Sequence, residues 1–271
     1  MKNLIQKLFK SFGYKLVKNK SFETMNFDIK NIFNYFERWV TIFEIDNQRF
    51  NERNDDLLTS DYKSERVSML NIDKVKEATD FKDKKIIEFG PLEGGNSILL
   101  ESLGIKSNVA IEGHRENYIK CCVIKNLFKL DRTSFIFEDA MNVDKLKLGN
   151  FDCAFVAGLL YHLKEPHLFI EKLSGVCNSI ILSTHYSSED QINHSIKLND
   201  TFIKGYKYEE SPGPNSGLDS YSFWPTKEGL LEILKINGFK KIDIVRDFND
   251  DYHLEKQKST YKMIYLIAHK I

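Results

Sequence analysis

Residues 86–95 have the sequence IIEFGPLEGG, in which a short β-branched segment runs into a glycine-rich turn. Residues 96–103 then carry apolar side chains at helical spacing, so this region predicts a strand, a tight turn and a helix. Glycines let a backbone approach a ligand closely, and the free amide groups of a helix N-terminus face such a ligand. We therefore predict a ligand-binding turn at the end of this strand.

The same alternation of short apolar segments and helix-length connections continues along the chain. The expected strands are 86–89, 109–112, 135–137, 153–157 and 179–183, and the expected helices are 96–103, 116–128 and 166–173. This order indicates right-handed crossovers and a parallel sheet. A later helix is expected to begin after Thr226 and to end at Asn237 and Gly238. Residues 241–246 and 263–268 predict an antiparallel pair that closes the sheet.

The N-terminal residues 1–80 predict a helical cap, and residues 81–271 predict the main domain. Residues 1–20 contain six lysines and no acidic residue, which is typical of an amphipathic basic helix. Such a helix either packs on the domain with its lysines in water, which we favour, or contacts an anionic membrane surface or a partner. Further helices are expected over 29–43 and 65–78, with a loop over 44–63.

Composition bounds the class of protein. The 271 residues are 42% hydrophobic and 29% charged, as in globular domains, and 39 basic residues balance 39 acidic ones. A zero net charge disfavours nucleic acid as the main partner, and no apolar stretch approaches the roughly 18 residues that span a bilayer. The four cysteines lack zinc-ligand spacing, so we expect reduced thiols in a cytoplasmic protein and no metal site.

Acidic residues follow three consecutive expected strands. Glu88 and Glu112 end the first two, and Glu138 with Asp139 follows the third. The carboxyl ends of parallel strands share one edge of a sheet, where ligands bind. A carboxylate after the second strand can accept hydrogen bonds from ribose hydroxyls, and one after the third strand can accept a hydrogen bond from an exocyclic amine such as that of adenine. The dinucleotide fingerprint and the phosphate-binding lysine are both absent.

Together these segments resemble the class I S-adenosylmethionine-dependent methyltransferases over residues 80–271. The resemblance rests on EFGPLEGG at 88–95, IEG at 111–113, EDA at 138–140 and FDCA at 151–154 leading to GLLYHLKEP at 158–166. The LYHLxxP run and the THYS sequence at 184–187 look like a bacterial subgroup of that family. SFWPT at 222–226 fits this subgroup and partly matches tRNA wobble-uridine carboxymethyl-transferring enzymes.

The resemblance implies an α/β fold with a Rossmann-like, mostly parallel seven-stranded sheet whose last strand is antiparallel. It also implies S-adenosylmethionine as the cofactor, with the methionine part near the glycine turn, the ribose at Glu112, the adenine at Asp139 and the sulfonium at Gly158. The implied cofactor-binding residues are Glu88, Phe89, Gly90, Glu93, Gly94, Gly95, Glu112, Gly113, His114, Asn117, Asp139, Ala140, Gly158 and Leu159.

Methyl transfer to an alcohol requires removal of the hydroxyl proton, a task suited to histidine. His185 is our preferred base and His162 the second candidate, with Tyr161 and Tyr186 as hydrogen-bonding neighbours. Either histidine could instead have a structural role. We expect O-methylation of a small metabolite or glycan; an RNA-modifying transferase and a non-catalytic cofactor-binding protein are the alternatives.

Residues 186–225 predict a long irregular segment that contains SPGPNSG at 211–217, and its many aromatic residues favour an ordered lid over the acceptor. The charged residues Lys204, Lys207, Glu209 and Glu210 within it are expected to be solvated.

Overall fold

The computed structural model describes residues 29–36, 39–45, 48–50, 79–213, 215–248 and 262–271. The chain divides into two compact units, Met1–Trp39 and Val40–Ile271. The helices predicted over 1–20 and 65–78 lie outside the described residues. Within the first unit, helix α2 (Ile29–Tyr35) is followed by Trp39, whose indole N–H donates to the carbonyl of Phe33 over 2.9 Å.

The helix predicted over 29–43 is wrong in its second half. Helix α2 ends at Tyr35, and Phe43–Ile45 forms strand β1, which pairs antiparallel with β2 (Gln48–Phe50). The predicted loop therefore begins with a hairpin. The β-branched and aromatic side chains of residues 39–43 suit an extended chain as well as a helix. The amides of Val40 and Thr41 are bound by Glu93, a partner that sequence periodicity does not reveal.

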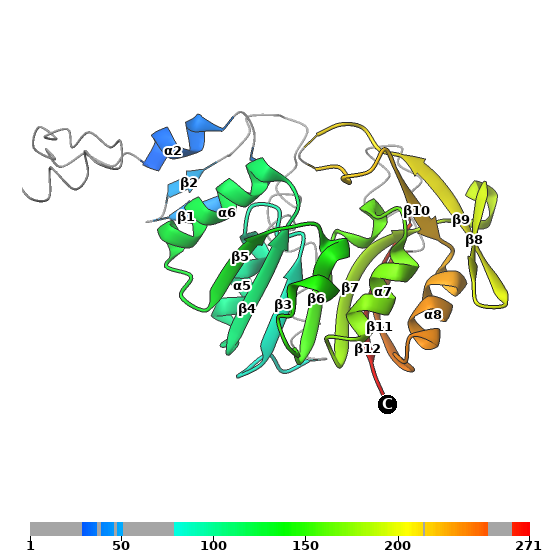
Figure 1. Ribbon diagram of the computed structural model, residues 1–271. Coiled ribbons are helices and arrows are strands. Elements are labelled where there is room, and N and C mark those ends of the chain that lie inside the picture. Colours follow the sequence, from blue (N-terminus) through cyan, green and yellow to red (C-terminus); the bar gives the residue numbers. More distant parts are fainter. Residues whose placement is uncertain (1–28, 37–38, 46–47, 51–78, 214, 249–261) are drawn as a thin grey trace, which may run out of the picture. The chain divides into compact units, whose positions relative to one another are not determined.

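The main domain contains a seven-stranded sheet of order β11-β12-β7-β6-β3-β4-β5, which Figure 1 shows from β5 at one edge to β11 at the other. Its strands are β3 (Lys85–Phe89), β4 (Ser107–Glu112), β5 (Thr133–Phe137), β6 (Cys153–Ala157), β7 (Ser179–Tyr186), β11 (Lys241–Phe248) and β12 (Lys262–His269). Strands β3 to β7 pair in parallel, whereas β12 runs antiparallel to both β7 and β11. The predicted fold class is confirmed.

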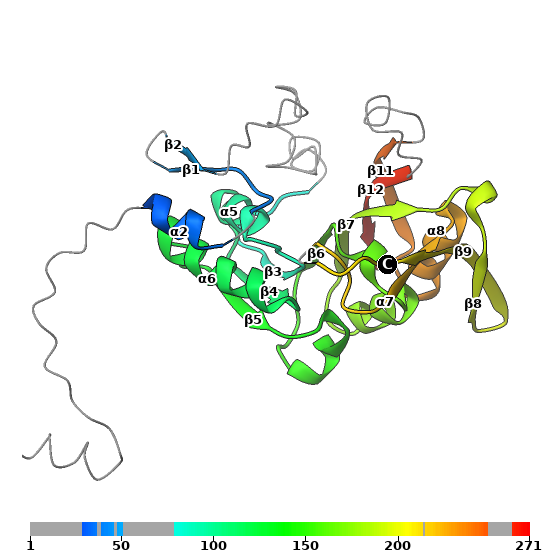
Figure 2. The same cartoon turned by 90° about the horizontal axis from the view of Figure 1, so that it is seen from above.

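Helices cover both faces of this sheet. They are α5 (Gly95–Ser102), α6 (Arg115–Phe128), α7 (Pro166–Ser174) and α8 (Lys227–Ile236), with the short 3-10 helices η1 (Ala140–Leu146), η2 (Leu160–His162) and η3 (Glu189–Gln191). Figure 2 shows α5 on one side of the sheet and α7 and α8 on the other. Two hydrophobic cores result, one under α7 and α8 and one under α5.

Helix α8 begins and ends where the sequence predicts. The hydroxyl oxygen of Thr226 accepts from the amide of Gly229 over 3.1 Å, which satisfies one free donor at the helix N-terminus. Gly238 has a φ of +91°, a conformation that glycine adopts without strain after the C-terminal cap Asn237.

The prediction of an irregular segment over 186–225 is wrong. Much of it forms a second, three-stranded antiparallel sheet of β8 (His194–Leu198), β9 (Thr201–Glu209) and β10 (Tyr221–Pro225). Along β9, buried Ile203 and Gly205 alternate with exposed Phe202 and Lys204, the period of a half-buried strand. A Cβ on Gly205 would lie 2.7 Å from the ring of Phe223, so only glycine lets β9 and β10 pack this closely.

Across the described ranges, no helix combines the length and the apolar character needed to span a bilayer.

Candidate functional site

The glycine turn after β3 is shaped by positive φ angles. Gly90 has a φ of +65°, and Gly94, which caps α5, has a φ of +86°. A Cβ on Gly90 would lie 3.3 Å from Cβ of Leu159, the residue that precedes η2. The turn after β3 and the turn after β6 therefore touch, which brings two of the predicted cofactor-binding residues together.

Glu88 is a buried carboxylate just before this turn, 1% exposed. Its Oε2 accepts from the hydroxyl of Ser97 over 2.6 Å and from Nδ2 of Asn108 over 2.7 Å. Its Oε1 is buried and has no hydrogen-bond partner among the described residues. Burial raises the pKa of Glu88 to about 7, although both hydrogen bonds act against this rise. The site thus offers a carboxylate oxygen with unused acceptor capacity.

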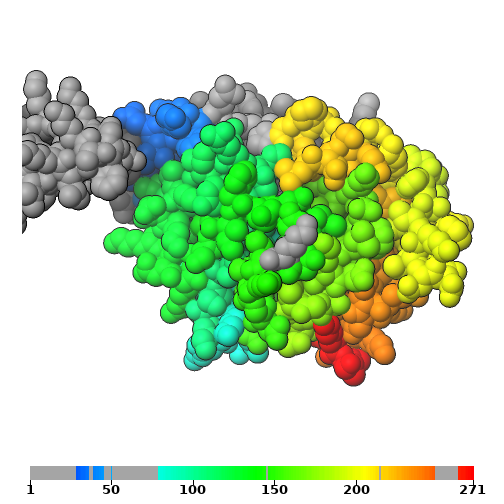
Figure 3. Space-filling view, in the orientation of Figure 1, coloured from blue at the N-terminus to red at the C-terminus, as the bar shows by residue number. Residues whose placement is uncertain are grey.

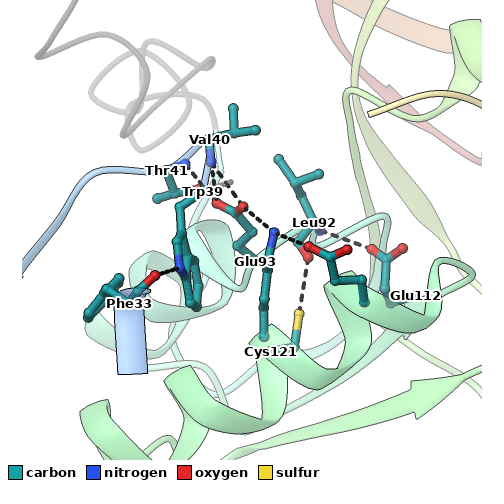
Figure 4. Close-up of polar contacts among 10 residues, drawn as sticks. Phe33, Trp39, Val40, Thr41, Leu92, Glu93, Glu112 and Cys121 are labelled. Atoms are coloured by element: carbon teal, nitrogen blue, oxygen red, sulfur yellow. Dashed lines mark hydrogen bonds and ion pairs between the residues drawn. The ribbon is translucent and has the colours of Figure 1, made fainter. Parts of the chain in front are cut away.

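Glu112, at the end of β4, joins the glycine turn to the next strand. Its carboxylate accepts from the amide of Leu92 over 3.1 Å, as Figure 4 shows, and from the amide of His114 over 2.8 Å. Burial raises the pKa of Glu112, while these amides and the side chain of Asn117 counteract the rise. The predicted residues Glu112, His114 and Asn117 are therefore neighbours.

Glu93, another predicted cofactor-binding residue, has protein partners for its carboxylate. Its oxygens accept from the amide of Val40 over 2.9 Å and from that of Thr41 over 2.7 Å (Figure 4). In addition, Oε1 lies 3.3 Å from Nζ of Lys120. The structure thus gives Glu93 a role in fastening residues 40–41 to the glycine turn. A prediction from motif position alone could not identify these partners.

Asp139 follows β5 and caps η1. Its Oδ1 accepts from the amide of Met141 over 2.8 Å, while the carboxylate of Glu138 accepts from the amide of Asp139 over 2.9 Å. Ala140, the other residue predicted near the adenine, is 7% exposed. Both residues lie at the carboxyl end of β5, on the same edge of the sheet as Glu88 and Glu112.

Three of the four predicted catalytic residues form an aromatic cluster at the ends of β6 and β7. The ring of Tyr161 lies 4.2 Å from that of His162 and 4.4 Å from that of His185. Burial raises the pKa of the Tyr161 hydroxyl. Tyr186 does not join them, because its hydroxyl donates to Asp247 over 2.7 Å.

His185 is enclosed by this cluster. Its ring stacks on Trp224 at 5.2 Å, and its Nδ1 lies 3.2 Å from the carbonyl oxygen of Lys262. Burial lowers the pKa of His185 to about 4; the hydrogen bond to Lys262 raises it and the charge of His162 lowers it further. At neutral pH the imidazole is therefore uncharged.

Sequence reasoning missed Glu210. The expectation that it is solvated is wrong, since its side chain is 4% exposed and its Oε1 lies 3.0 Å from Nδ1 of His162. Glu210 begins a segment, residues 210–213 and 215–220, that we call the strap. Figure 3 shows the strap, in yellow to light orange, along the upper edge of the molecule. The partner of Glu210 lies 48 residues away, so no local pattern signals this contact.

The strap contacts the candidate site at two places, near the end of β4 and near η2. The carbonyl of Ser216 lies 2.7 Å from Nε2 of His114. A Cβ on Gly113 would lie 2.8 Å from Leu218, and a Cβ on Gly217 would lie 2.3 Å from the carbonyl oxygen of His162. The strap therefore packs against the residue after Glu112 and against the backbone of His162. The described residues contain no group of three or more His, Cys, Asp or Glu side chains arranged to hold a metal ion.

Comparison with known proteins supports the fold. No protein-family model matches the chain, and no curated protein matches it in sequence. Among solved structures, the N-terminal domain of EvdMO1 with SAH bound is 24% identical, with a TM-score of 0.71 over 90% of this chain and 96% of that chain. The same domain in the presence of SAH and D-fucose is 22% identical, also with a TM-score of 0.71 and the same coverage.

Two further comparisons set the extent of this likeness. The chain covers 47% of the longer EvdMO1 structure. An O-methyltransferase family protein from Burkholderia thailandensis is 11% identical, with a TM-score of 0.52 over 77% of this chain and 57% of that chain. The chain thus has the fold of the S-adenosylmethionine-dependent methyltransferases. The glycine turn, the acidic residues at the strand ends and the aromatic cluster of Tyr161, His162 and His185, called the histidine cluster below, lie at one edge of its sheet.

Proposed function

We propose that the protein transfers a methyl group from S-adenosylmethionine to a hydroxyl group of a small metabolite or glycan. The observation that carries this proposal is the contact between the two turns: Gly90 packs on Leu159, three residues before His162. A ligand held at the glycine turn is therefore adjacent to the histidine cluster. Methyl transfer needs such an alignment of methyl donor and acceptor.

The residues around the glycine turn fit the cofactor. The unused Oε1 of buried Glu88 suits the ammonium group of the methionine part, and Glu112 suits the ribose hydroxyls. Gly90 and Gly94 leave backbone where side chains would otherwise stand. Asp139 lies where the adenine amine would be recognised. When bound, S-adenosylmethionine supplies a methyl group on a sulfonium, which is electrophilic.

The acceptor is proposed to be a sugar or a related polyol. The N-terminal domain of EvdMO1, which shares this fold, was crystallised in the presence of SAH and D-fucose. A sugar hydroxyl is a weak acid, so its proton must pass to a base as the new bond forms. The histidine cluster at the ends of β6 and β7 supplies imidazole groups for that purpose.

Calorimetric titration with S-adenosylmethionine and with S-adenosylhomocysteine tests the cofactor site. We expect both ligands to bind, and Glu112→Gln to weaken each by about tenfold through loss of one charge-assisted hydrogen bond. The control is Glu232→Gln, which removes an exposed carboxylate on α8. Absence of binding by folded wild type, or equal effects of the two substitutions, would contradict this site.

A transfer assay then tests the reaction. The wild-type protein is incubated with radiolabelled S-adenosylmethionine and a panel of free and glycosidic sugars that includes D-fucose. We expect label in an ether-linked methyl group of at least one sugar. Binding of the cofactor without transfer to any hydroxyl acceptor would favour the non-catalytic alternative.

A further inference from the structure

Glu210 holds the imidazole of His162 through one ring nitrogen. Nδ1 of His162 lies 3.0 Å from Oε1 and 3.2 Å from Oε2 of Glu210. A carboxylate only accepts hydrogen bonds, so Nδ1 carries the proton and Nε2 of the neutral ring keeps a lone pair. This is the tautomer that can accept a proton at Nε2.

Glu210 is itself held in place. Its Oε2 accepts from the amide of Gly217 over 3.2 Å, and the hydroxyl of Ser222 is a further hydrogen-bond partner. Ser222 Oγ in turn accepts from the indole N–H of Trp224 over 3.1 Å. Burial acts to raise the pKa of Glu210, but the hydrogen bond and charge of His162, with Ser222 and Gly217, outweigh it and lower the pKa. The carboxylate is therefore charged and preorganised at neutral pH.

The two histidines differ in what surrounds them. His185 is packed against Tyr161 and Trp224 and bonded to a backbone carbonyl, which cannot compensate a full positive charge. The His162 side chain is 18% exposed, and Glu210 lies against it. Among the described residues, His185 and Tyr161 are further titratable groups that face His162. In this cluster the carboxylate of Glu210 therefore lies where it can compensate a positive charge on His162.

We propose that His162 is the base of the transfer reaction and that Glu210 is its positioning residue. This inference rests on the proposed function and names the group that takes the proton there. The acceptor oxygen gains the methyl group and loses its proton to Nε2 of His162, while the electron pair of the broken carbon–sulfur bond goes to sulfur. Glu210 compensates the positive charge that forms on the imidazole.

The ring tautomer can be measured without any ligand. In the full chain with ¹⁵N-labelled histidine, two-dimensional NMR at about pH 9, above the ordinary imidazole pKa, reports which nitrogen carries the proton. We expect His162 to be protonated at Nδ1, to lose that preference in Glu210→Ala and to keep it in Glu210→Asp. Glu209→Ala is the matched control, because the neighbouring Glu209 side chain is 74% exposed. Protonation at Nε2 in wild type, or an unchanged tautomer in Glu210→Ala, would overturn the assignment.

Kinetics with an acceptor sugar and S-adenosylmethionine complete the test. We expect His162→Gln to lower kcat by about 10²-fold or more, and Glu210→Ala by about tenfold, with the Kd for S-adenosylmethionine unchanged within about twofold. Unchanged binding separates these effects from misfolding. A larger loss of kcat in His185→Gln than in His162→Gln would overturn the choice of base while leaving the methyltransferase proposal intact. Absence of cofactor binding and of transfer in wild type would instead defeat the proposed function.

Discussion

The ammonium group of Lys120 lies 3.3 Å from a carboxylate oxygen of Glu93, and each side chain is 1% exposed. Lys120 also lies 2.9 Å from Glu116, one turn earlier on α6. Because Glu93 accepts from the amides of Val40 and Thr41 as well, this one buried pair connects α6, the glycine turn and the segment before β1.

Removing one member of the pair should be costly. We expect Lys120→Met to lower the free energy of unfolding by about 3 kcal/mol or more, because it leaves the Glu93 carboxylate buried without its cation. The double variant Lys120→Met, Glu93→Gln should recover part of that loss. Urea unfolding of the two single variants and the double variant measures the coupling. Strictly additive losses would show that the pair does not interact energetically.

The contribution of Glu88 to the free energy of unfolding should be largest in mild acid. Its pKa is raised from 4.5 to about 7 in the folded state, so the folded protein binds the proton more tightly than the unfolded chain. Its contribution is then most favourable below pH 4.5 and falls by about 3 kcal/mol as the pH rises toward 7. Glu88→Gln should remove this contribution, so that between pH 4.5 and 7 the stability of the variant rises more steeply with pH than that of wild type, as measured by urea unfolding. The same pH dependence in wild type and variant would refute it.

His185 should have the opposite effect. Its folded-state pKa is lowered from 6.5 to about 4, so its contribution is complete above pH 6.5 and is lost as the pH falls through 4. The loss amounts to about 3 kcal/mol. Between pH 4.5 and 6.5 the free energy of unfolding falls with pH through Glu88 and rises with pH through His185, so the two effects oppose each other. In His185→Gln only the Glu88 effect is left, and we expect the stability of this variant to fall as the pH rises. A variant no more pH-dependent than wild type would argue against a low pKa for His185.

The strap should control activity more than stability. A Cβ on Gly217 would lie 2.3 Å from the carbonyl oxygen of His162, so Gly217→Ala must displace the strap. We expect about a tenfold loss of kcat, since Glu210 would lose its alignment with His162. Gly213→Ala is the control within the same strap, because among the described residues its Cβ would meet only Ser216, at 3.7 Å. Equal kcat values with unchanged Tm in both variants would exclude a role for strap position.

The sheet could be predicted because its strands carry their own signal. Strand β6 is buried along its whole length, so Cys153–Ala157 is continuously apolar, and the ends of α8 are marked by Thr226 and Gly238. The second sheet is not predicted from the sequence, because the prolines and glycines of residues 211–217 indicate a loop more strongly than the alternation of polar and apolar residues in β9 indicates a strand. Two predictions near the site are wrong, the helix through residues 39–43 and the solvated side chain of Glu210. In both cases the contacts that fix the structure come from residues far away in the sequence. The amide of Val40 is bound by a residue 53 positions later, and no local period encodes that contact.

The position of β12 bears on how the chain acquires its structure during synthesis. Strand β12 lies between β7 and β11, although it is made after both. Until residues 262–269 have left the ribosome, the hydrogen-bonding edges of β7 and β11 lack their native neighbour. Such open edges are prone to pair with other chains. During synthesis the two edges that β12 joins therefore stay open to other strands until β12 is inserted between them.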